Sequence, residues 1–230
     1  MFGGNEFNAA SVGLQAIVKF AAGVALTGVL LFWPAGSWAY YNGWLLMGVL
    51  FVPMMVVGVV LMVRNPKLLE RRMQHKEKQR EQSAVVRLSG LMFVAGFVLA
   101  GLGARYGWYV LPMWVSVVAA VVLLLAYLLY TEVLRENTYL SRTIEVQEGQ
   151  MLVDTGLYGV VRHPMYSATV LMFMSMPLVL GSLPAFVLFL SYPALIVLRI
   201  RGEERLLETE LKGYQEYKTR VKYRLIPHLW

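Results

Sequence analysis

The sequence predicts an all-α protein: a multispanning bundle of transmembrane helices with an amphipathic C-terminal helix on its cytoplasmic side. Of the 230 residues, 58% are hydrophobic and only 15% are charged, whereas about a quarter of the residues in an ordinary soluble domain are charged. The hydrophobic residues fall in about six long runs, which is typical of integral membrane proteins. Lys and Arg gather in the connections on one side of these runs, as the positive-inside rule predicts.

Four long apolar runs form the N-terminal part of the chain, residues 1–131. A helix that crosses a bilayer requires about 20 mostly apolar residues. Pro53 predicts a kink in the second of these helices. We interpret the glycine-rich stretch 101–107 as a turn, because its glycines do not fit a dinucleotide-binding fingerprint and no strand precedes it. The four helices are expected at 14–34, 43–63, 88–104 and 108–131.

Two shorter apolar runs follow the polar stretch 132–164. We expect them to form a helical hairpin over 165–181 and 184–200, because the Gly-Ser-Leu-Pro sequence at 181–184 is typical of a tight turn. The length of the two runs leaves open whether the hairpin crosses the bilayer fully.

The C-terminal segment combines charge with a regular apolar spacing. Leu207, Leu211, Tyr214 and Val221 recur at helical spacing, which predicts an amphipathic helix that lies on the cytoplasmic membrane surface or caps the bundle. Gly213 interrupts this pattern and predicts a bend. We therefore expect a single integral membrane domain over 1–230, in which 132–230 holds the chemistry.

The distribution of positive charge predicts the orientation of the chain. The connection 64–87 holds eight Lys or Arg, whereas 35–42 and 104–107 together hold only Arg105. The basic connection, the polar stretch and both termini are therefore expected in the cytoplasm. The N-terminus carries Glu6 and no basic residue, so the first apolar run is expected to stay as a membrane helix rather than to act as a cleaved signal peptide.

The composition excludes several classes of function. The chain has no cysteine, which excludes disulfides, thiolate metal sites and a cysteine nucleophile. The positive-inside distribution accounts for the net charge of +7, so nucleic-acid binding is not expected. Asp154 is the only aspartate and no Gly-x-Ser-x-Gly motif is present, which argues against a Ser-His-Asp hydrolase. No partner protein is identifiable, and the expected partners are membrane lipids and a methyl acceptor that is a lipophilic small molecule or a lipid-modified one.

Polar residues converge at the predicted mouth of the hairpin. Arg162 and His163 stand directly before its first helix, and Glu203 and Glu204 stand directly after its second. The hairpin therefore makes Arg162 and Glu204 near neighbours in space. On a continuous helix Glu204 shares the apolar face of Leu207, so its carboxylate points inward and needs a partner such as Arg162.

The same residues leave other interpretations open. Glu203 has Arg199 one helical turn before it, and such pairs often serve as interfacial anchors without a chemical role. A metal site would use His163, Glu203, Glu204 and His228. The motif holds one histidine and no His-x-x-x-His pair, so we expect no metal.

The motif Gly-Leu-Tyr-Gly-Val-Val-Arg-His-Pro-Met-Tyr at 156–166 carries a family resemblance. With Gly-Ser at 181–182, Glu-Glu at 203–204 and Gly-Tyr-Gln-Glu-Tyr at 213–217, it resembles the isoprenylcysteine carboxyl methyltransferase family of integral membrane methyltransferases. It is also similar to the related phospholipid methyltransferases. The resemblance implies that S-adenosyl-L-methionine binds in a cytoplasm-facing pocket, and that a lipophilic acceptor enters between helices from the bilayer.

The resemblance also implies roles for single residues. Arg162 and Glu204 would be catalytic, with Arg162 holding an anionic acceptor. Direct methyl transfer needs alignment and exclusion of water more than a protein nucleophile. For a thiol or amine acceptor, Glu204 or His163 would serve as the general base. The residues implied to bind the cofactor are Tyr158, Val160, Val161, His163, Pro164, Tyr166, Glu203, Tyr214 and Tyr217.

The expected activity is methyl transfer from S-adenosylmethionine to a membrane-borne acceptor, an isoprenylcysteine-like carboxylate first of all. A phospholipid amine or a small thiol stays open as the acceptor. Membrane sterol reductases, which use NADPH, resemble the same region, so an oxidoreductase is a further alternative. A transporter or scaffold also stays open, although a transporter is expected to place polar groups at the bilayer midplane, whereas this cluster lies at the predicted interface.

Overall fold

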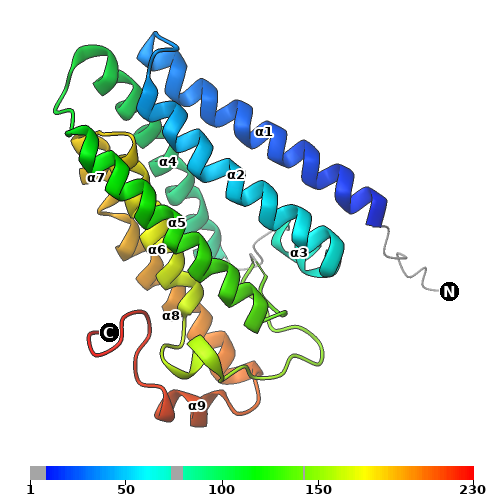
Figure 1. Cartoon of the computed structure of the whole chain (residues 1–230). Helices are drawn as coiled ribbons and strands as arrows, with labels where there is room; N and C mark the ends of the chain where they lie inside the picture. The colour runs from blue at the N-terminus through cyan, green and yellow to red at the C-terminus, as the bar shows by residue number, and fades with distance from the viewer. Residues whose placement is uncertain (1–8, 74–79, 142) are drawn as a thin grey trace.

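The computed structural model describes residues 9–73, 80–141 and 143–230, and within these ranges the chain forms helices and loops but no β-strand. Five helical segments are long and apolar enough to cross a membrane, and a sixth apolar helix is shorter. The predicted all-α membrane bundle is thus confirmed (Figure 1). In chain order the helices are α1 (Ala9–Ala35), α2 (Tyr41–Arg64), α3 (Pro66–Met73), α4 (Arg80–Tyr106), α5 (Met113–Glu136), the 3₁₀ turn η1 (Gly156–Gly159), α6 (Pro164–Val179), α7 (Leu183–Phe189), α8 (Tyr192–Glu210) and α9 (Tyr214–Arg220).

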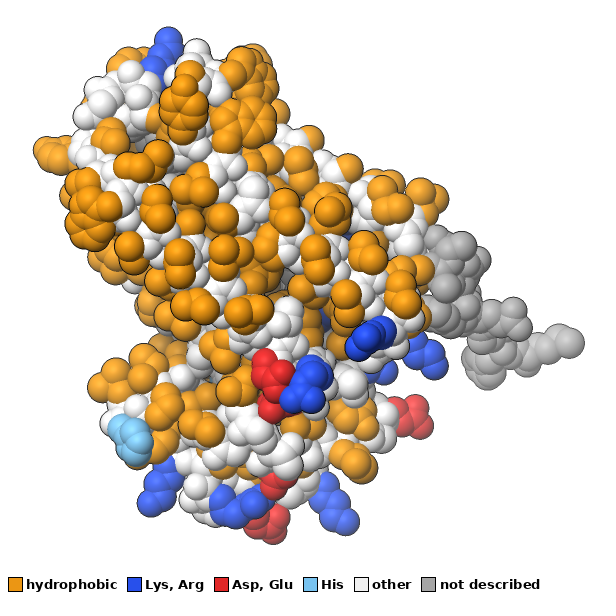
Figure 2. All heavy atoms as spheres, viewed as in Figure 1, with side chains coloured by type: hydrophobic (Ala, Val, Ile, Leu, Met, Phe, Trp, Pro, Cys, Tyr) orange, Lys and Arg blue, Asp and Glu red, His pale blue; other side chains and the backbone are white. Residues whose placement is uncertain are grey.

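The bundle is apolar both inside and outside. Leu31, Leu46, Leu123, Phe189 and Ile200 are fully buried where α1, α2, α5, α7 and α8 meet. Large hydrophobic side chains also cover the outer surface of the long helices, whereas the charged side chains gather at the end where α9 lies (Figure 2). A helix that is hydrophobic all round is typical of a membrane span, so the outer apolar surface fits a bilayer.

The predicted turn at 101–107 is wrong. The chain stays helical through this stretch to Tyr106, and the turn begins at Gly107, whose φ is +69°. Gly101 is present because α4 crosses α1 closely: a Cβ atom there would lie 2.5 Å from the carbonyl oxygen of Leu31. Glycine in a membrane helix here permits close packing, rather than a change of chain direction.

The fourth membrane helix begins at Met113, later than the predicted start at 108. The residues before it run beside the turn between α6 and α7, where the amide of Leu111 donates to the carbonyl of Gly181 at 2.8 Å. The tight turn predicted at 181–184 is confirmed. Gly181 has a φ of +67°, and the Ser182 hydroxyl accepts from the amide of Ala185 at the start of α7.

The single amphipathic helix predicted at the C-terminus is two helices. The second arm of the hairpin, expected as one helix over 184–200, is also two helices: α7 ends at Phe189, and α8 begins at Tyr192, with a proline in its first turn, and continues to Glu210. Gly213, with a φ of +85°, then makes the predicted bend before α9. Tyr214 and Tyr217 of α9 are buried in a small cluster with Leu152, so this helix caps the charged end of the bundle (Figure 1).

The basic connection 64–87 contains a helix that the sequence did not indicate. Pro66–Met73 forms α3, in which Leu68 and Leu69 are buried. Asn65 caps this helix, because its side-chain oxygen accepts from the amide of Leu68 at 3.2 Å. Residues 66–73 are therefore a packed element of the charged end.

Candidate active site

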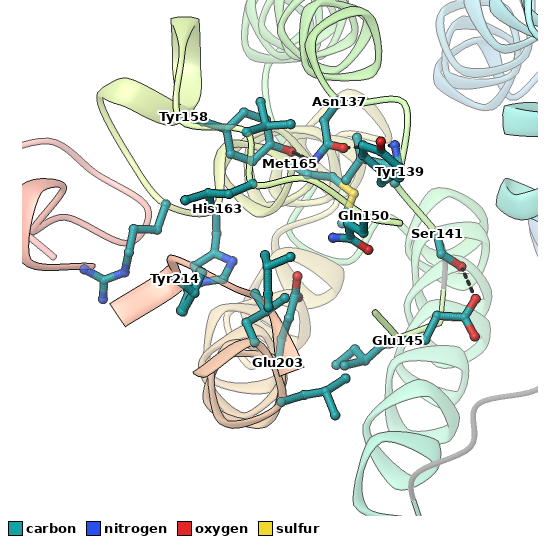
Figure 3. Close-up of a pocket in the computed structure, with 18 of the residues that line it drawn as sticks. Asn137, Tyr139, Ser141, Glu145, Gln150, Tyr158, His163, Met165, Glu203 and Tyr214 are labelled. Atoms are coloured by element: carbon teal, nitrogen blue, oxygen red, sulfur yellow. Dashed lines mark hydrogen bonds between the residues drawn. The ribbon is translucent and has the colours of Figure 1, made fainter. Parts of the chain in front are cut away.

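The charged end of the bundle contains a pocket between the loop after α5, the start of α6, the end of α8 and α9. The cavity among its side chains has a volume of about 90 Å³, which is below the roughly 300–1,000 Å³ of typical small-molecule sites. Figure 3 shows His163, Tyr214 and Glu203 on one side of it and Ser141 and Glu145 on the other. Seven residues predicted from the sequence line this pocket: Tyr158, Arg162, His163, Tyr166, Glu203, Tyr214 and Tyr217.

Four predicted residues lie outside the lining. The side chain of Val160 is half exposed on the surface, and Val161 and Pro164 are buried behind the pocket wall. Glu204 is also buried and reaches the pocket only through the residues that contact it. The structure therefore brings most of the predicted residues to one pocket, but places these four around it.

A glycine turn places Tyr158 in the pocket. The amide of Leu157 donates to both carboxylate oxygens of Glu136, at 3.1 and 3.0 Å. Gly156 has a φ of +53°, and a Cβ atom there would lie 1.5 Å from that carboxylate. Only glycine fits this position. The Tyr158 hydroxyl then accepts from the side-chain amide of Asn137 at 3.1 Å.

Arg162 and Glu204 form a buried ion pair, which confirms that the hairpin brings them together. The Nε and Nη2 atoms of Arg162 both lie 2.8 Å from Glu204 Oε1. His163 Nε2 lies 3.3 Å from the same oxygen, and Arg224 Nε donates to the other oxygen at 2.9 Å. Three basic side chains thus share one buried carboxylate, and of these the Arg224 side chain is 30% exposed.

The remaining donor of Arg162 holds the C-terminal tail. Its Nη1 donates to the carbonyls of Val221 and Lys222 at 2.8 and 3.0 Å. The amides of Arg162 and His163 donate to the carbonyls of Tyr223 and Arg224, both at 2.9 Å. The tail is therefore fixed along the start of α6. The Arg162 guanidinium hydrogen-bonds only to groups of the protein itself among the described residues. Binding of an acceptor by Arg162 stays a prediction.

Glu203 takes part in a second polar group inside the pocket. The Tyr166 hydroxyl donates to Glu203 Oε2 and accepts from Arg199 Nε at 3.2 Å. Tyr166 is buried, and its hydroxyl connects the Glu203 carboxylate with the Arg199 guanidinium in the pocket wall. Glu203 and Arg199 both line the pocket as well.

Tyr214 brings a hydroxyl without a partner into the pocket. Its side chain is buried, and no described residue hydrogen-bonds to its hydroxyl oxygen. Burial, together with the carboxylates of Glu204 and Glu203, raises the pKa of Tyr214 well above the ordinary tyrosine value of 10.0. The neighbouring Tyr217 hydroxyl, in contrast, donates to the carbonyl of Tyr158 at 2.7 Å. A buried polar group without a partner is costly and often marks a ligand site.

Sequence reasoning missed the wall that the loop after α5 contributes. Asn137, Tyr139, Ser141, Glu145 and Gln150 all line the pocket. Their signal was the unusual length of the polar stretch 132–164 in an apolar chain, but no periodicity indicated which side chains point inward.

Two arginines of α3 fasten this loop to the bundle. Arg71 Nη1 donates to the carbonyl of Thr138, and Arg72 Nη1 donates to the carbonyl of Ser141, both at 2.9 Å. Arg72 also donates to the Tyr130 hydroxyl. The sequence had explained these arginines only as positive charge on one side of the membrane.

The residues considered for a metal do not form a cluster. Within the described part of the chain, no group of three His, Asp or Glu side chains is placed to hold an ion. His228 contacts the Tyr223 hydroxyl through its Nδ1 at 3.3 Å.

Comparison with known proteins identifies the region that carries this pocket. Among curated proteins, the Delta(14)-sterol reductase TM7SF2 of Mus musculus is 36% identical over 91 residues, which are 38% of this chain. The chain covers only 22% of the length of that reductase. The family model of the phospholipid methyltransferases matches residues 111–212, from the start of α5 to the end of α8. This match confirms the resemblance of the pocket-bearing region to the integral membrane methyltransferases.

Proposed function

We propose that this protein transfers a methyl group from S-adenosylmethionine to a lipophilic acceptor in the membrane. The observation that carries the proposal is the pocket at the charged end of the bundle, which combines an unpartnered Tyr214 hydroxyl with carboxylates and aromatic rings. The family match at 111–212 supports a membrane methyltransferase.

The pocket residues fit the charges of S-adenosylmethionine. Glu203 and Glu145 line the pocket, and carboxylates accept hydrogen bonds from an ammonium group or from ribose hydroxyls. The Tyr214 hydroxyl is a free donor for the carboxylate of the methionine part. The rings of Tyr158 and Tyr214 suit a positively charged sulfur through cation–π attraction. When bound, the cofactor supplies an activated methyl group.

The protein contributes alignment of the cofactor with the acceptor and exclusion of water. The cluster of Arg162, Glu204 and Arg224 fixes the start of α6 and the C-terminal tail at one side of the pocket. The Nε2 atom of His163 lies 3.3 Å from Glu204 Oε1. In the tautomer that donates from Nε2, the Nδ1 atom is the acceptor that a general base for a thiol or amine requires. Holding reactants in register in this way accounts for much of the rate enhancement of direct transfer reactions.

The chemical class of the methyl acceptor is weighed from the contacts of Arg162. An isoprenylcysteine-like carboxylate was expected to bind Arg162, but this guanidinium already contacts Glu204 and two tail carbonyls. A phospholipid amine needs no such cation and fits the matched family by its description. The proposed acceptor classes are therefore an isoprenylcysteine-like carboxylate, a phospholipid amine and a small thiol, and all three are to be tested as substrates.

The sterol reductase similarity supports a second candidate, an NADPH-dependent reductase. NADPH carries several phosphate charges, which proteins usually meet with free arginines, lysines or helix N-termini. The lining of this pocket includes the carboxylates of Glu145 and Glu203 and the guanidinium groups of Arg162 and Arg199. Both guanidinium groups already contact protein groups, Arg162 the Glu204 carboxylate and Arg199 the Tyr166 hydroxyl. The charges of the lining are thus balanced, and direct binding measurements separate the two cofactors.

We further propose that the pocket faces the cytoplasm and that both termini lie there. The support is the charge distribution: Arg71, Arg72 and the basic tail lie at the same end of the bundle as the pocket. Positive charge is retained on the cytoplasmic side of membrane proteins. Access of a chemical reagent to a cysteine introduced at Ser37 or at Lys212, in intact cells, tests this orientation.

Calorimetric titration of the detergent-purified protein tests the cofactor. We expect saturable binding of S-adenosylmethionine and S-adenosylhomocysteine and no binding of NADPH. Glu203→Gln should weaken binding, whereas Glu208→Gln, on the same helix but outside the pocket, should not. Binding of NADPH alone would move the protein to the reductases, and binding of neither ligand class would contradict both candidates.

A further inference from the structure

A second pocket lies at the end of the bundle opposite to the proposed active site. It is enclosed by the turn between α1 and α2, the last turn of α4, the connection to α5 and the turn between α6 and α7. Its volume is about 490 Å³, enough for a long apolar group. No residue of the proposed methyltransferase site lines it.

Small side chains leave this space open. Ala35, Ala39, Ala100, Gly103 and Ala104 line the pocket. A larger apolar side chain at several of these positions would fill the space, as packed protein interiors normally are filled.

The walls of the second pocket are held by hydrogen bonds between distant segments. The Tyr40 hydroxyl donates to the carbonyl of Leu180 at 2.8 Å, and the Asn42 side chain donates to the Ser116 hydroxyl at 2.9 Å. A Cβ atom on Gly181 would lie 2.6 Å from the Asn42 amide nitrogen. Hydrogen bonds between segments far apart in the sequence therefore hold the lining residues of this pocket in place.

One positive charge stands at the rim. Arg105 follows Ala104, and its guanidinium lies 3.5 Å from where a Cβ atom of Gly36 would be, between the lining residues Ala35 and Ser37. Arg105 is exposed, and among the described residues it only stacks on the Tyr106 ring, 5.5 Å from its centroid, without a hydrogen bond or ion pair. The segments 35–43, 104–115 and 178–185 hold no Asp or Glu. This end thus offers one cation and no competing carboxylate.

Aromatic side chains place the rim at the membrane surface. Trp38, Trp44, Trp108, Tyr109 and Trp114 are all exposed around this end. Such residues are enriched at the level of the lipid headgroups. The rim cation is therefore at the depth of lipid phosphates, and the pocket, which Trp108 also lines, lies beside it.

We propose that the second pocket binds an anionic phospholipid of the bilayer, with its phosphate on Arg105 and an acyl chain in the pocket itself. Guanidinium groups form strong charge-assisted hydrogen bonds with phosphate. A zwitterionic lipid carries the same phosphate but also a cation of its own, so the free charge of Arg105 favours a lipid with net negative charge. This site is separate from the methyltransferase proposal and does not depend on it.

Native mass spectrometry of the detergent-purified protein, titrated with phosphatidylglycerol or phosphatidylcholine of equal chain length, tests the site. We expect the anionic lipid to bind about tenfold more tightly, the ratio that one charge-assisted hydrogen bond supports. Arg105→Gln should abolish this preference, and Arg105→Lys should retain most of it. Arg205→Gln, which removes the same charge from exposed α8 at the other end, is the matched control.

A second variant tests the pocket itself. Ala104 lines the pocket and is exposed on a helix, so Ala104→Leu should fold normally and weaken binding of both lipids. Equal binding of the two lipids by the unmodified protein would overturn the proposal. So would an equal loss of preference in Arg105→Gln and Arg205→Gln, since that result means non-specific charge attraction.

Discussion

The unpartnered hydroxyl of Tyr214 makes a prediction in which stability and binding change in opposite directions. Tyr214→Phe removes one oxygen from a buried ring and leaves the packing of that ring intact. A buried polar group without a partner costs about 1–3 kcal/mol. The ligand-free variant should therefore be as stable as the unmodified protein or more stable, with a melting temperature higher by roughly 2–4 °C for each kcal/mol gained.

Binding should change in the other direction. If the hydroxyl donates to a charged group of the cofactor, its loss costs about 1.5–3 kcal/mol, which is roughly a 10- to 100-fold weaker affinity for S-adenosylhomocysteine. Because burial holds the pKa of Tyr214 above its ordinary value of 10.0, the folded protein keeps this proton as pH rises. The ratio of the two affinities should thus be constant from pH 7 to about pH 10.

Thermal unfolding without ligand and calorimetric titration, on the same preparations, measure both effects. Tyr106→Phe, an exposed tyrosine at the far end of the bundle, is the control and should change neither quantity. The reasoning would be refuted by a Tyr214→Phe variant that is clearly less stable and binds the ligand normally, because the hydroxyl would then have a structural partner and no ligand.

Three further predictions follow from the contacts around the pocket. Glu204→Gln should lower the free energy of unfolding by about 3–5 kcal/mol, because it leaves the buried Arg162 charge unpaired. Glu208→Gln, which breaks a partly exposed pair, should lower it by at most about 1 kcal/mol. Equal losses for the two variants in chemical denaturation would contradict the importance of the buried pair. Arg72→Gln should weaken S-adenosylhomocysteine binding, because it releases the loop after α5 that lines the pocket, and Arg64→Gln on the same connection should not. If calorimetric titration gives an unchanged affinity for both variants, the loop holds its place without α3. Gly156→Ala should destabilise the protein by about 1–3 kcal/mol, since the added carbon overlaps the Glu136 carboxylate; a normal melting temperature would show that this turn adapts.

Much of the site was predictable because it depends on helix geometry. The pairing of Arg162 with Glu204 follows from a hairpin between them and from the helical face that Glu204 shares with Leu207, and both features are written in local sequence patterns. The membrane helices followed from hydrophobicity over about 20 residues. These inferences needed no knowledge of long-range packing.

The parts that were missed depend on tertiary contacts. In isolation, Gly101 looks like a turn residue. It lies inside α4, and a glycine is needed there because α1 crosses α4 closely. Arg71 and Arg72 look like ordinary cytoplasmic charge until the loop carbonyls that they hold are placed beside them. The engagement of Arg162 by the tail carbonyls was equally invisible, because a backbone acceptor carries no sequence signal.

The most direct test of the proposed function is methyl transfer itself. Purified protein is incubated with S-adenosylmethionine carrying a radiolabelled methyl group and with a prenylated cysteine, a phospholipid with a primary amine, or a lipophilic thiol, and the organic phase is counted. We predict label in the organic phase with at least one acceptor and its loss in Glu203→Gln. Tight cofactor binding with no transfer to any of the three acceptors would contradict the acceptor classes proposed here. The absence of both binding and transfer would contradict the methyltransferase assignment.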